Sequence, residues 1–196
     1  MVKKNSGRLP APERRAQILQ CALREFAAAG YGATSTRELA TAAGVTEPVL
    51  YRHFRGKEDL FAAVLADVAE RLAIALETAL ATGKGARARI EALAAALPDL
   101  LDRFGPEFRL LCGAAAAPGG KVQIAATRAA VSRLETTIAK ALGGPHLRKG
   151  IDPELAASFL LQVGLGHALV RPLAPQALAR ADIRERMVDL LVGGLL

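Results

Sequence analysis

Residues 35–60 read STRELATAAGVTEPVLYRHFRGKEDL, and this stretch decides the fold of the N-terminal part of the chain. Ser35 and Glu38 have the spacing of a capping box, in which each side chain bonds the other residue's backbone at the start of a helix. Gly44 is expected to end that helix in a tight turn, and Thr46 is expected to cap the next helix through its hydroxyl. The stretch therefore predicts two short helices joined by a tight turn and followed by a longer helix.

The second short helix is expected to bury one face and present the other to solvent. Leu50 and Phe54 stand four residues apart and are its expected inward anchors. The positions expected to face outward are Glu47, Pro48, Val49, Tyr51, Arg52 and Arg55. Such a pair of helices with a tight turn is a helix-turn-helix, whose second helix enters the DNA major groove. A plain pair of antiparallel helices in a bundle is the alternative.

The rest of the chain carries apolar residues at helical spacing. Pro12 is expected to open a helix that Gly30 ends, and Lys57 is expected to open a long fourth helix. Further helices are expected at 86–104, 106–116, 119–142, 152–171 and 179–194. The predicted fold is all-α with about nine helices. Residues 1–60 are expected to form an arm and a helix-turn-helix DNA-binding domain, and 61–196 a helical effector-binding and dimerisation domain.

Composition restricts the class of protein. With 196 residues, of which 52% are hydrophobic, the chain can bury a core and is not expected to be disordered. The net charge of +7 and the pI of about 9.9 suit a polyanionic partner, although an ordinary basic surface would look the same. Cys21 and Cys112 lie in apolar contexts without metal-ligand spacing, so both are expected to be free thiols in a reducing compartment.

The sequence carries no motif typical of secretion, membrane insertion or catalysis. The basic N-terminus lacks the apolar run of a signal peptide, and 155–170 contains Gln162 and His167 and is short for a membrane span. We find no P-loop, dinucleotide-binding, nucleophile or metal-ligand motif. A cytoplasmic protein that is not an enzyme, without metal or cofactor, is therefore expected.

The block from Glu13 to Leu60 resembles the tetracycline-repressor (TetR) family of bacterial transcriptional regulators. The shared segments read FAAAGY at 26–31, TRELA at 36–40, AGV at 43–45, LYRHF at 50–54 and KEDL at 57–60. The later helices agree in number and length with the family's ligand-binding and dimerisation domain. The resemblance implies a ligand-responsive regulator, commonly a repressor, that binds a palindromic operator in double-stranded DNA. A sequence-independent architectural DNA-binding protein is the alternative.

The resemblance also implies which side chains contact DNA. Phosphate contacts are implied for Thr36, Thr46, Tyr51, His53 and Lys57, and His53 could instead be a structural histidine at the helix end. Base contacts are implied for Arg37 with guanine, Glu47 with cytosine and Val49 with a thymine methyl. Pro48 and Arg52 complete this outward surface. Gly56 departs from the Ser or Asn common in the family, which removes one side-chain contact to a phosphate but still allows a cap.

A homodimer is expected, because one helix-turn-helix binds DNA weakly and two-fold operators match two-fold proteins. The expected contact surface lies on the last two helices, at Leu160, Val163, Gly164, His167, Met187, Leu190 and Leu191. Because Gly164 has no side chain, it would let a partner helix approach closely. Some of these side chains must alternatively fill the protein's own core.

The resemblance implies a small, largely apolar effector in the second domain. The candidate contacts are Phe104, Phe108, Leu111, Cys112, Phe159 and Gln162, with Gln162 or His167 supplying the polar contact. Each of these could also be an ordinary core residue, and Cys112 could be a redox sensor, although no nearby base or second cysteine is evident. An effector that prefers the DNA-incompetent state would release the operator.

Overall fold

The structure is a computed structural model, and it describes residues 9–117, 119–143, 147, 151–170, 173 and 181–195. Within those residues it consists of helices without a strand, which confirms the all-α fold. The helices are α1 (Ala11–Ala33), α2 (Thr36–Ala42), α3 (Glu47–His53), α4 (Lys57–Ala81), α5 (Ala86–Arg103), α6 (Gly105–Ala116), α7 (Lys121–Leu142), α8 (Pro153–Val170) and α10 (Ala181–Leu195). Each predicted helix has a counterpart whose ends differ by only a few residues.

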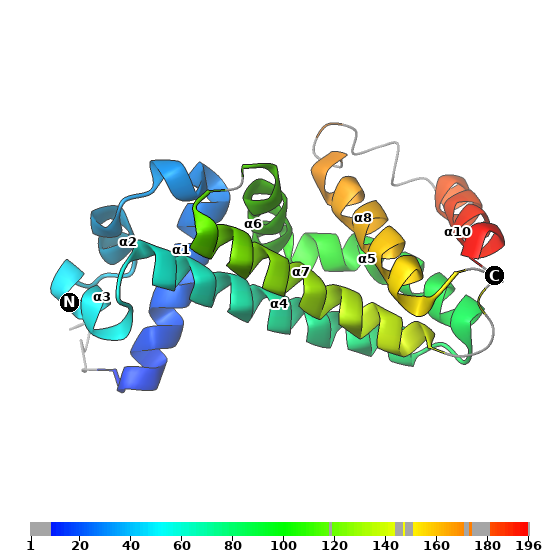
Figure 1. Cartoon of the computed structure of the whole chain (residues 1–196), viewed down its shortest axis with the longest axis horizontal. Coiled ribbons are helices and arrows are strands. Elements are labelled where there is room, and N and C mark those ends of the chain that lie inside the picture. The colour runs from blue at the N-terminus through cyan, green and yellow to red at the C-terminus, as the bar shows by residue number, and fades with distance from the viewer. Residues whose placement is uncertain are drawn as a thin grey trace, which may run out of the picture.

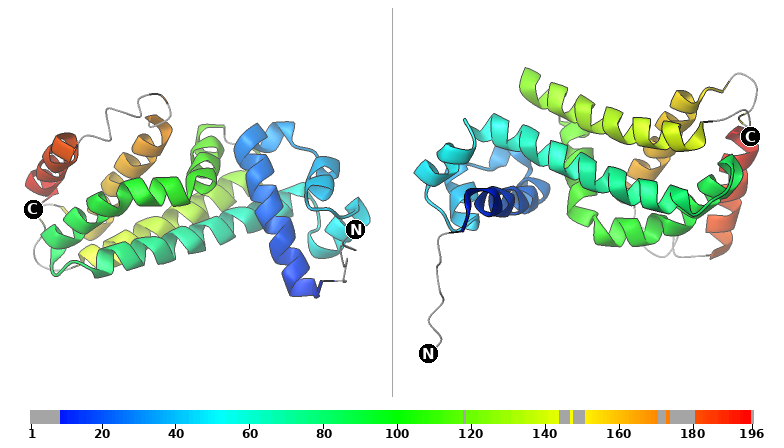
Figure 2. Two further views of the ribbon diagram at one scale, coloured as in Figure 1. Left: turned by 180° about the vertical axis from the view of Figure 1, so that it is seen from behind. Right: turned by 90° about the horizontal axis from the view of Figure 1, so that it is seen from below.

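Two long helices form the spine of the molecule. α4 runs without interruption from Lys57 to Ala81, and α7 packs along it. Figure 1 shows α1, α2 and α3 at one end of this pair and α5, α8 and α10 toward the other. Figure 2 shows α4 and α7 side by side from a second direction. α4 therefore connects the helix-turn-helix to the rest of the molecule without a flexible linker.

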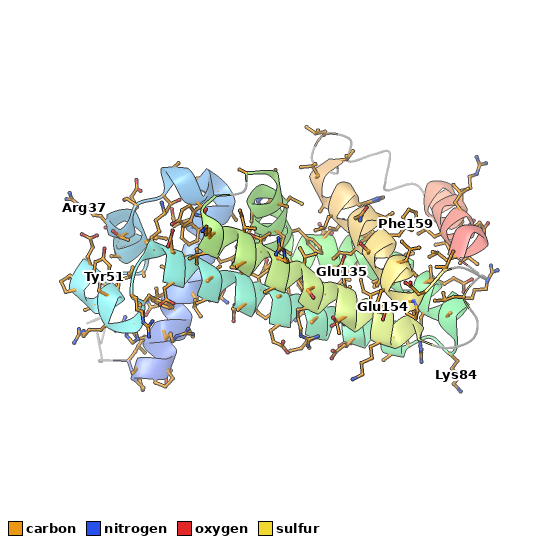
Figure 3. All side chains as sticks on the ribbon, viewed as in Figure 1. Arg37, Tyr51, Lys84, Glu135, Glu154 and Phe159 are labelled. Carbon is orange, nitrogen blue, oxygen red and sulfur yellow. The ribbon has the colours of Figure 1, made fainter. Side chains whose placement is uncertain are left out.

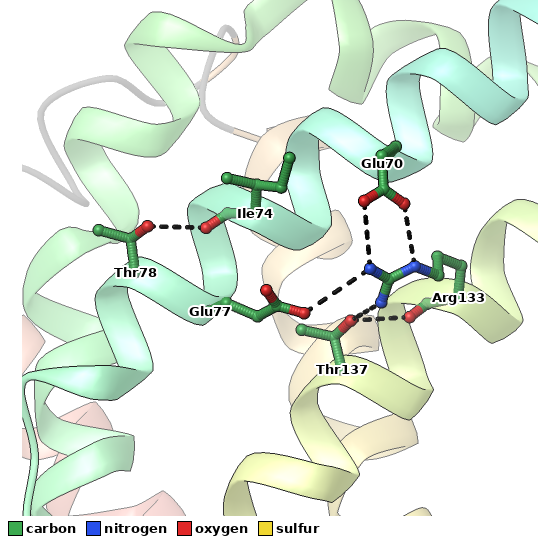
Figure 4. Close-up of polar contacts among 6 residues, drawn as sticks. All are labelled: Glu70, Ile74, Glu77, Thr78, Arg133 and Thr137. Carbon is green, nitrogen blue, oxygen red and sulfur yellow. Dashed lines mark hydrogen bonds and ion pairs between the residues drawn. The ribbon is translucent and has the colours of Figure 1, made fainter.

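The contact between α4 and α7 combines an apolar core with ion pairs at its surface. Leu72 of α4 and Leu134 of α7 are buried in the same core. At the surface, Arg133 of α7 lies 3.2 Å from a carboxylate oxygen of Glu70 and 3.6 Å from one of Glu77 (Figure 4). Exposed ion pairs contribute only roughly 0.2–1 kcal/mol each, so the apolar core carries most of the stability of this contact.

The first helix ends later than the sequence predicts. Gly30 leaves the helical conformation with a φ of 80°, as its predicted role required, but one more helical turn follows and ends at Ala33. The bend places the Tyr31 ring against Phe26 and Phe61, with ring centroids 5.9 and 4.9 Å away. This aromatic cluster packs the end of α1 onto the first turns of α4.

Helix α8 is unusually apolar on its outside. By length and composition alone it is the one described helix that could cross a membrane, with a mean hydropathy of 1.2. Only 22% of it is buried inside the molecule, and its exposed apolar residues are Leu155, Phe159, Leu169 and Val170. A helix of a soluble protein can meet the same criterion, so the apolar face is weak evidence for a membrane span.

Candidate nucleic-acid interface

A capping box at the start of α2 and a tight turn after it define the first half of the helix-turn-helix. The Ser35 hydroxyl accepts from the Glu38 N–H at 3.2 Å, and the Glu38 carboxylate accepts from the Ser35 N–H at 2.7 Å. These bonds confirm the capping box. The Ser35 N–H, together with the Ser35 hydroxyl that also donates to the Glu38 carboxylate at 2.7 Å, lowers the pKa of the Glu38 carboxyl below its ordinary value. Gly44 then turns the chain with a φ of 64°, a left-handed conformation that favours glycine.

Helix α3 buries one face and exposes the other, as predicted. Leu50 is fully buried and Phe54 is 2% exposed, whereas Tyr51 between them is 49% exposed. Arg52 beside Tyr51 and Arg37 of α2 are also exposed. Figure 3 shows Arg37 and Tyr51 at the end of the molecule that carries α2 and α3. The surface formed by α2, α3 and the first turn of α4 is therefore open to a large partner.

The predicted DNA-contacting residues all lie on this surface. The exposed ones are Arg37, Thr46, Pro48, Tyr51 and Arg52, and the partly buried ones are Thr36, Glu47, Val49, His53 and Lys57. Among these ten residues the two arginines and the lysine outnumber the one carboxylate of Glu47, while Glu38, Glu58 and Asp59 of the same elements add three further acids. The position of these residues is thus suitable for the role, and contact of each with DNA stays a prediction.

Three of these residues are hydrogen-bonded to one another. The Thr36 hydroxyl donates to Glu47 Oε1 at 2.7 Å, and the Tyr51 hydroxyl donates to Thr36 Oγ1 at 3.4 Å. Thr36 is the first residue of α2 and Glu47 is the first residue of α3, so the bonds tie the starts of the two helices together. The sequence predicted a separate DNA contact for each of the three residues. It did not predict the hydrogen bonds among them, because those bonds depend on how α2 and α3 cross.

Two cations of this region lie over aromatic rings. Nζ of Lys57 is 4.1 Å from the centre of the Tyr31 ring, and the Arg15 guanidinium carbon is 5.0 Å from the centre of the Phe54 ring. A π face attracts a cation and holds it in place, so Tyr31 helps to position the ammonium group predicted to meet a phosphate. Tyr31 belongs to the shared FAAAGY segment at 26–31, but no contact was predicted from the sequence for it or for Arg15.

Tyr31 also connects the helix-turn-helix to α7. Its pKa is raised mainly by burial and then by the negative charge of Glu58, while a hydrogen bond with Gln123 of α7 opposes the shift. The buried Gln123 side chain lies across Gly119, where a Cβ atom would stand only 1.1 Å from its Oε1.

One predicted cap is wrong and another is right. Thr46 is the N-cap residue of α3, but its side chain makes no capping hydrogen bond. The Thr46 carbonyl instead accepts from the N–H groups of Val49 and Leu50, at 2.9 and 3.1 Å, as the helix itself requires. Gly56 caps α4 as predicted, without a side chain.

The residues predicted to contact an effector fall into two groups. Phe104, Phe108 and Leu111 are buried in the apolar core where α5 meets α6. Cys112 is partly buried beside them in sequence, with its Sγ 3.8 Å from the Leu165 carbonyl oxygen of α8, and burial raises the pKa of its thiol. An effector site at this core stays a prediction.

Phe159 and Gln162 lie apart from that core, on the outer side of α8. Phe159 is 47% exposed, and Gln162 is exposed and donates to the Ser158 hydroxyl on its own helix at 3.2 Å. The helical spacing of the sequence identified these residues as members of α8. It did not reveal which side of α8 faces the protein.

The residues predicted to form a dimer contact range from buried to exposed. Leu160 is buried, Val163, Gly164, His167 and Leu191 are partly buried, and Leu190 is 76% exposed. Met187 belongs to α10, but its side chain lies outside the described residues. The most exposed apolar positions of α8 are neighbours of the predicted ones, namely Leu155, Phe159, Leu169 and Val170. Dimer contact through α8 and α10 stays a prediction.

Comparison with known proteins identifies relatives of this arrangement. The family described as "Bacterial regulatory proteins, tetR family" matches residues 18–64. The transcriptional activator FasR of Mycolicibacterium smegmatis is 37% identical over 108 residues, which are 55% of this chain and 49% of FasR, so the chain spans about half of that relative. The nucleoid occlusion factor SlmA of Marinobacter nauticus is 33% identical over 150 residues, 75% of each chain.

Solved structures share the whole fold at low sequence identity. A TetR-family transcriptional regulator from Rhodococcus sp. matches with a TM-score of 0.77 and 19% identity, covering 94% of this chain and 100% of that one. AibR, solved with isovaleryl coenzyme A and operator DNA, matches with a TM-score of 0.67 and 23% identity, covering 93% of this chain and 100% of that one. The likeness therefore extends over both ends of the molecule.

Proposed function

The chain belongs to the tetR family of bacterial regulatory proteins, and from this premise we propose that it is a ligand-responsive repressor that binds a palindromic operator as a homodimer. The relatives named above are transcriptional regulators or, for SlmA, a nucleoid occlusion factor, and none is an enzyme, so the chain is not an enzyme. Its work is to bind DNA, to sense a small molecule and to couple the two. We place it in the cytoplasm, where the DNA is.

The division of α3 into a buried and an exposed face carries the proposal. The Leu50 side chain is fully buried and Tyr51 beside it is 49% exposed, which fixes the helix in the fold and leaves one side for the major groove. Arg37 of α2 and Lys57 of α4 flank that side with positive charge. Residues 1–60 act in this proposal as the DNA-binding domain, and 61–196 as the effector-binding and dimerisation domain.

A homodimer would place two such surfaces against two half-sites about one helical turn of DNA apart, roughly 34–36 Å. The exposed apolar face of α8, with Leu155 and Phe159, supports association through this helix, because large exposed apolar patches mark interaction sites. The predicted contacts at Val163, Gly164 and His167 lie on the same helix.

The effector in this proposal is small and largely apolar. The predicted contacts Phe104, Phe108 and Leu111 are apolar and buried, as is usual for the lining of a ligand site. The fold also accommodates a ligand and DNA in AibR, which was solved with isovaleryl coenzyme A and operator DNA. An effector that binds the DNA-incompetent state more tightly shifts the population toward that state and releases the operator.

Two observations keep a second function in view. SlmA, a nucleoid occlusion factor, is similar over 75% of the chain, and the basic surface would bind DNA of any sequence to some extent. The second candidate is therefore an architectural or chromosome-organising DNA-binding protein without an effector. It predicts either no preferred palindrome or many genomic sites whose occupancy leaves neighbouring transcription unchanged.

Selection of binding sites from random double-stranded DNA tests the proposal. We expect an enriched inverted repeat, and a reporter gene placed behind it should be repressed by the protein. A pool without an enriched repeat would overturn the specific-regulator function and favour the architectural one. Activation of the reporter would support a sequence-specific regulator but show that it is an activator and not a repressor, as the name of FasR states for that relative.

A further inference from the structure

The hydrogen bonds among Thr36, Glu47 and Tyr51 change the roles that these residues can have. A threonine hydroxyl has one hydrogen, and that of Thr36 is engaged at 2.7 Å with Glu47 Oε1. While this bond is made, Thr36 cannot donate to a phosphate. The Tyr51 hydroxyl donates to the same Thr36 oxygen at 3.4 Å. This long bond still favours the orientation in which the Thr36 hydroxyl points toward Glu47.

Glu47 is the acidic member of an otherwise basic or neutral set of predicted DNA contacts. Its carboxylate only accepts hydrogen bonds, and each nearby phosphate of DNA would repel it. A carboxylate here therefore costs affinity for DNA in general. Such a group is useful at this place if it distinguishes one base from another.

The major groove offers a carboxylate few favourable partners. Guanine presents the acceptors N7 and O6, and thymine presents the acceptor O4, all of which repel it. Adenine presents the N6 amino group next to the acceptor N7, whereas cytosine presents the N4 amino group without a neighbouring acceptor. Cytosine is therefore the base from which a fixed carboxylate most favourably accepts a hydrogen bond.

We propose that Thr36 and Tyr51 are positioning residues that hold the Glu47 carboxylate at the start of α3, so that the cytosine contact predicted for Glu47 determines specificity at one position of each half-site. This inference rests on the proposed function, since it requires a sequence-specific operator. The Thr36 bond fixes Oε1 and leaves Oε2 free to accept from the N4 amino group. The partly buried position of Thr36 and Glu47 restricts the carboxylate further.

Glu47→Gln is the first test, with the preferred site obtained by selection from random DNA and confirmed by titration. The glutamine Oε1 can still accept from Thr36, while the new amino group can donate to adenine N7. We expect the preference for cytosine over the other bases at one position of each half-site to fall about fivefold or more. The other positions should keep their preference. Glu91→Gln on α5 is the matched control and should select the wild-type site.

Thr36→Val and Thr36→Ser test the positioning role. Valine has the shape of threonine without the hydroxyl, so the Glu47 side chain loses its fixed position and the same base pair should show a weaker preference. Serine keeps the hydroxyl and should restore the wild-type preference, which a merely structural role of Thr36 would not predict. Circular dichroism melting checks that each variant is folded.

The outcomes separate this inference from the proposed function. If the wild-type protein selects no inverted repeat, the proposed function fails. If it selects one and Glu47→Gln selects the identical site, the specificity role of Glu47 is overturned. Uniform loss of binding to all sites by folded Glu47→Gln would overturn it as well. A Thr36→Val site identical to the wild-type site would overturn the positioning role.

Discussion

Arg71 of α4 and Glu107 of α6 form a largely buried ion pair, with Nη1 of Arg71 2.7 Å from Oε1 of Glu107. The Glu107 side chain is 7% exposed and that of Arg71 is 29% exposed. Nε of Arg71 also lies 2.9 Å from Oδ2 of Asp67, which is one turn earlier in α4. Nη2 of Arg71 is buried and has no hydrogen-bond partner among the described residues. The pair fastens α6 to the helix whose first turn carries the predicted phosphate contact.

Glu107→Ala should destabilise the protein by about 2–4 kcal/mol, because it leaves the Arg71 charge largely buried with less compensation. Urea unfolding followed by circular dichroism measures this. Arg71→Met combined with Glu107→Leu should recover much of the loss, since no buried charge is then stranded, and Asp67, whose side chain is 36% exposed, can be hydrated when it loses Arg71. Glu91→Ala is the control: it breaks the exposed pair with Arg87 and should cost less than about 1 kcal/mol. Equal losses for Glu107→Ala and Glu91→Ala would contradict the argument.

Lys57→Ala and Arg37→Ala should affect DNA binding in different ways. Loss of the Lys57 ammonium group should weaken matched and mismatched operators about equally and lower the slope of log K against log salt by about one. Loss of the Arg37 guanidinium should relax the preference at one base pair by about 1–3 kcal/mol. Fluorescence anisotropy titrations at several salt concentrations separate the two effects. Indistinguishable behaviour of the two variants would show that the division between phosphate and base contacts is wrong.

Gly44→Ala should lower stability by about 1–2 kcal/mol, because an L-residue is strained in the left-handed conformation of the turn. The φ of Gly44 is 64°, and nothing lies within 4 Å of an added Cβ, so the strain comes from the backbone alone. Gly32→Ala is the matched control, since Gly32 has equal space and lies in a helical turn. Thermal unfolding should show Gly32→Ala unchanged or stabilised, and a similar loss in both variants would argue against the turn.

The capping box should make stability depend on pH. The Ser35 bonds lower the pKa of Glu38 below its ordinary value of 4.5. The charged carboxylate therefore stabilises the fold above that value, and this contribution is lost as the pH falls through the lower folded-state pKa. Urea unfolding should find Glu38→Gln less stable than wild type at neutral pH, with the gap closing on acidification. A gap that stays constant with pH would mean that the charge of Glu38 has no such role.

Phe159→Glu should convert the proposed homodimer into a monomer, because it places a charge in the exposed apolar face of α8. Sedimentation velocity measures the change, and binding to a two-half-site operator should weaken about tenfold or more, since the two half-sites are no longer read together. Ile74→Glu is the matched control, because Ile74 on α4 is 53% exposed and Phe159 is 47% exposed. If both variants keep the same association state, the α8 interface is wrong.

Local features of this chain were predictable because their physical cause lies within a few residues. The capping box needs only Ser35 and Glu38, and the turn needs a residue that tolerates a left-handed conformation at Gly44. The inward position of Leu50 and Phe54 follows from the helical repeat. The hydroxyl cap predicted for Thr46 is absent, because such a cap also requires one particular side-chain rotamer, which the residue type does not fix.

Contacts between helices were not predictable in this way. Thr36 and Glu47 meet because α2 and α3 cross at their first residues, and Arg71 meets Glu107 because α6 packs on α4. The sequence identifies α8 as apolar without telling which side faces the core, so it did not predict that Phe159, a predicted effector contact, is 47% exposed. Each of these features depends on a different helix, and the periodicity of one helix contains no information about its neighbour.

The all-α fold and the helix-turn-helix between Ser35 and Lys57 follow from the amino-acid sequence alone, because caps, turn glycines and the apolar repeat act over short distances. Tertiary structure alone decided which side chains pair across helices. It hydrogen-bonds Thr36 to Glu47, sets Lys57 over Tyr31, and turns Phe159 away from the core, since these contacts depend on the crossing of helices and on which of their faces the shared core buries.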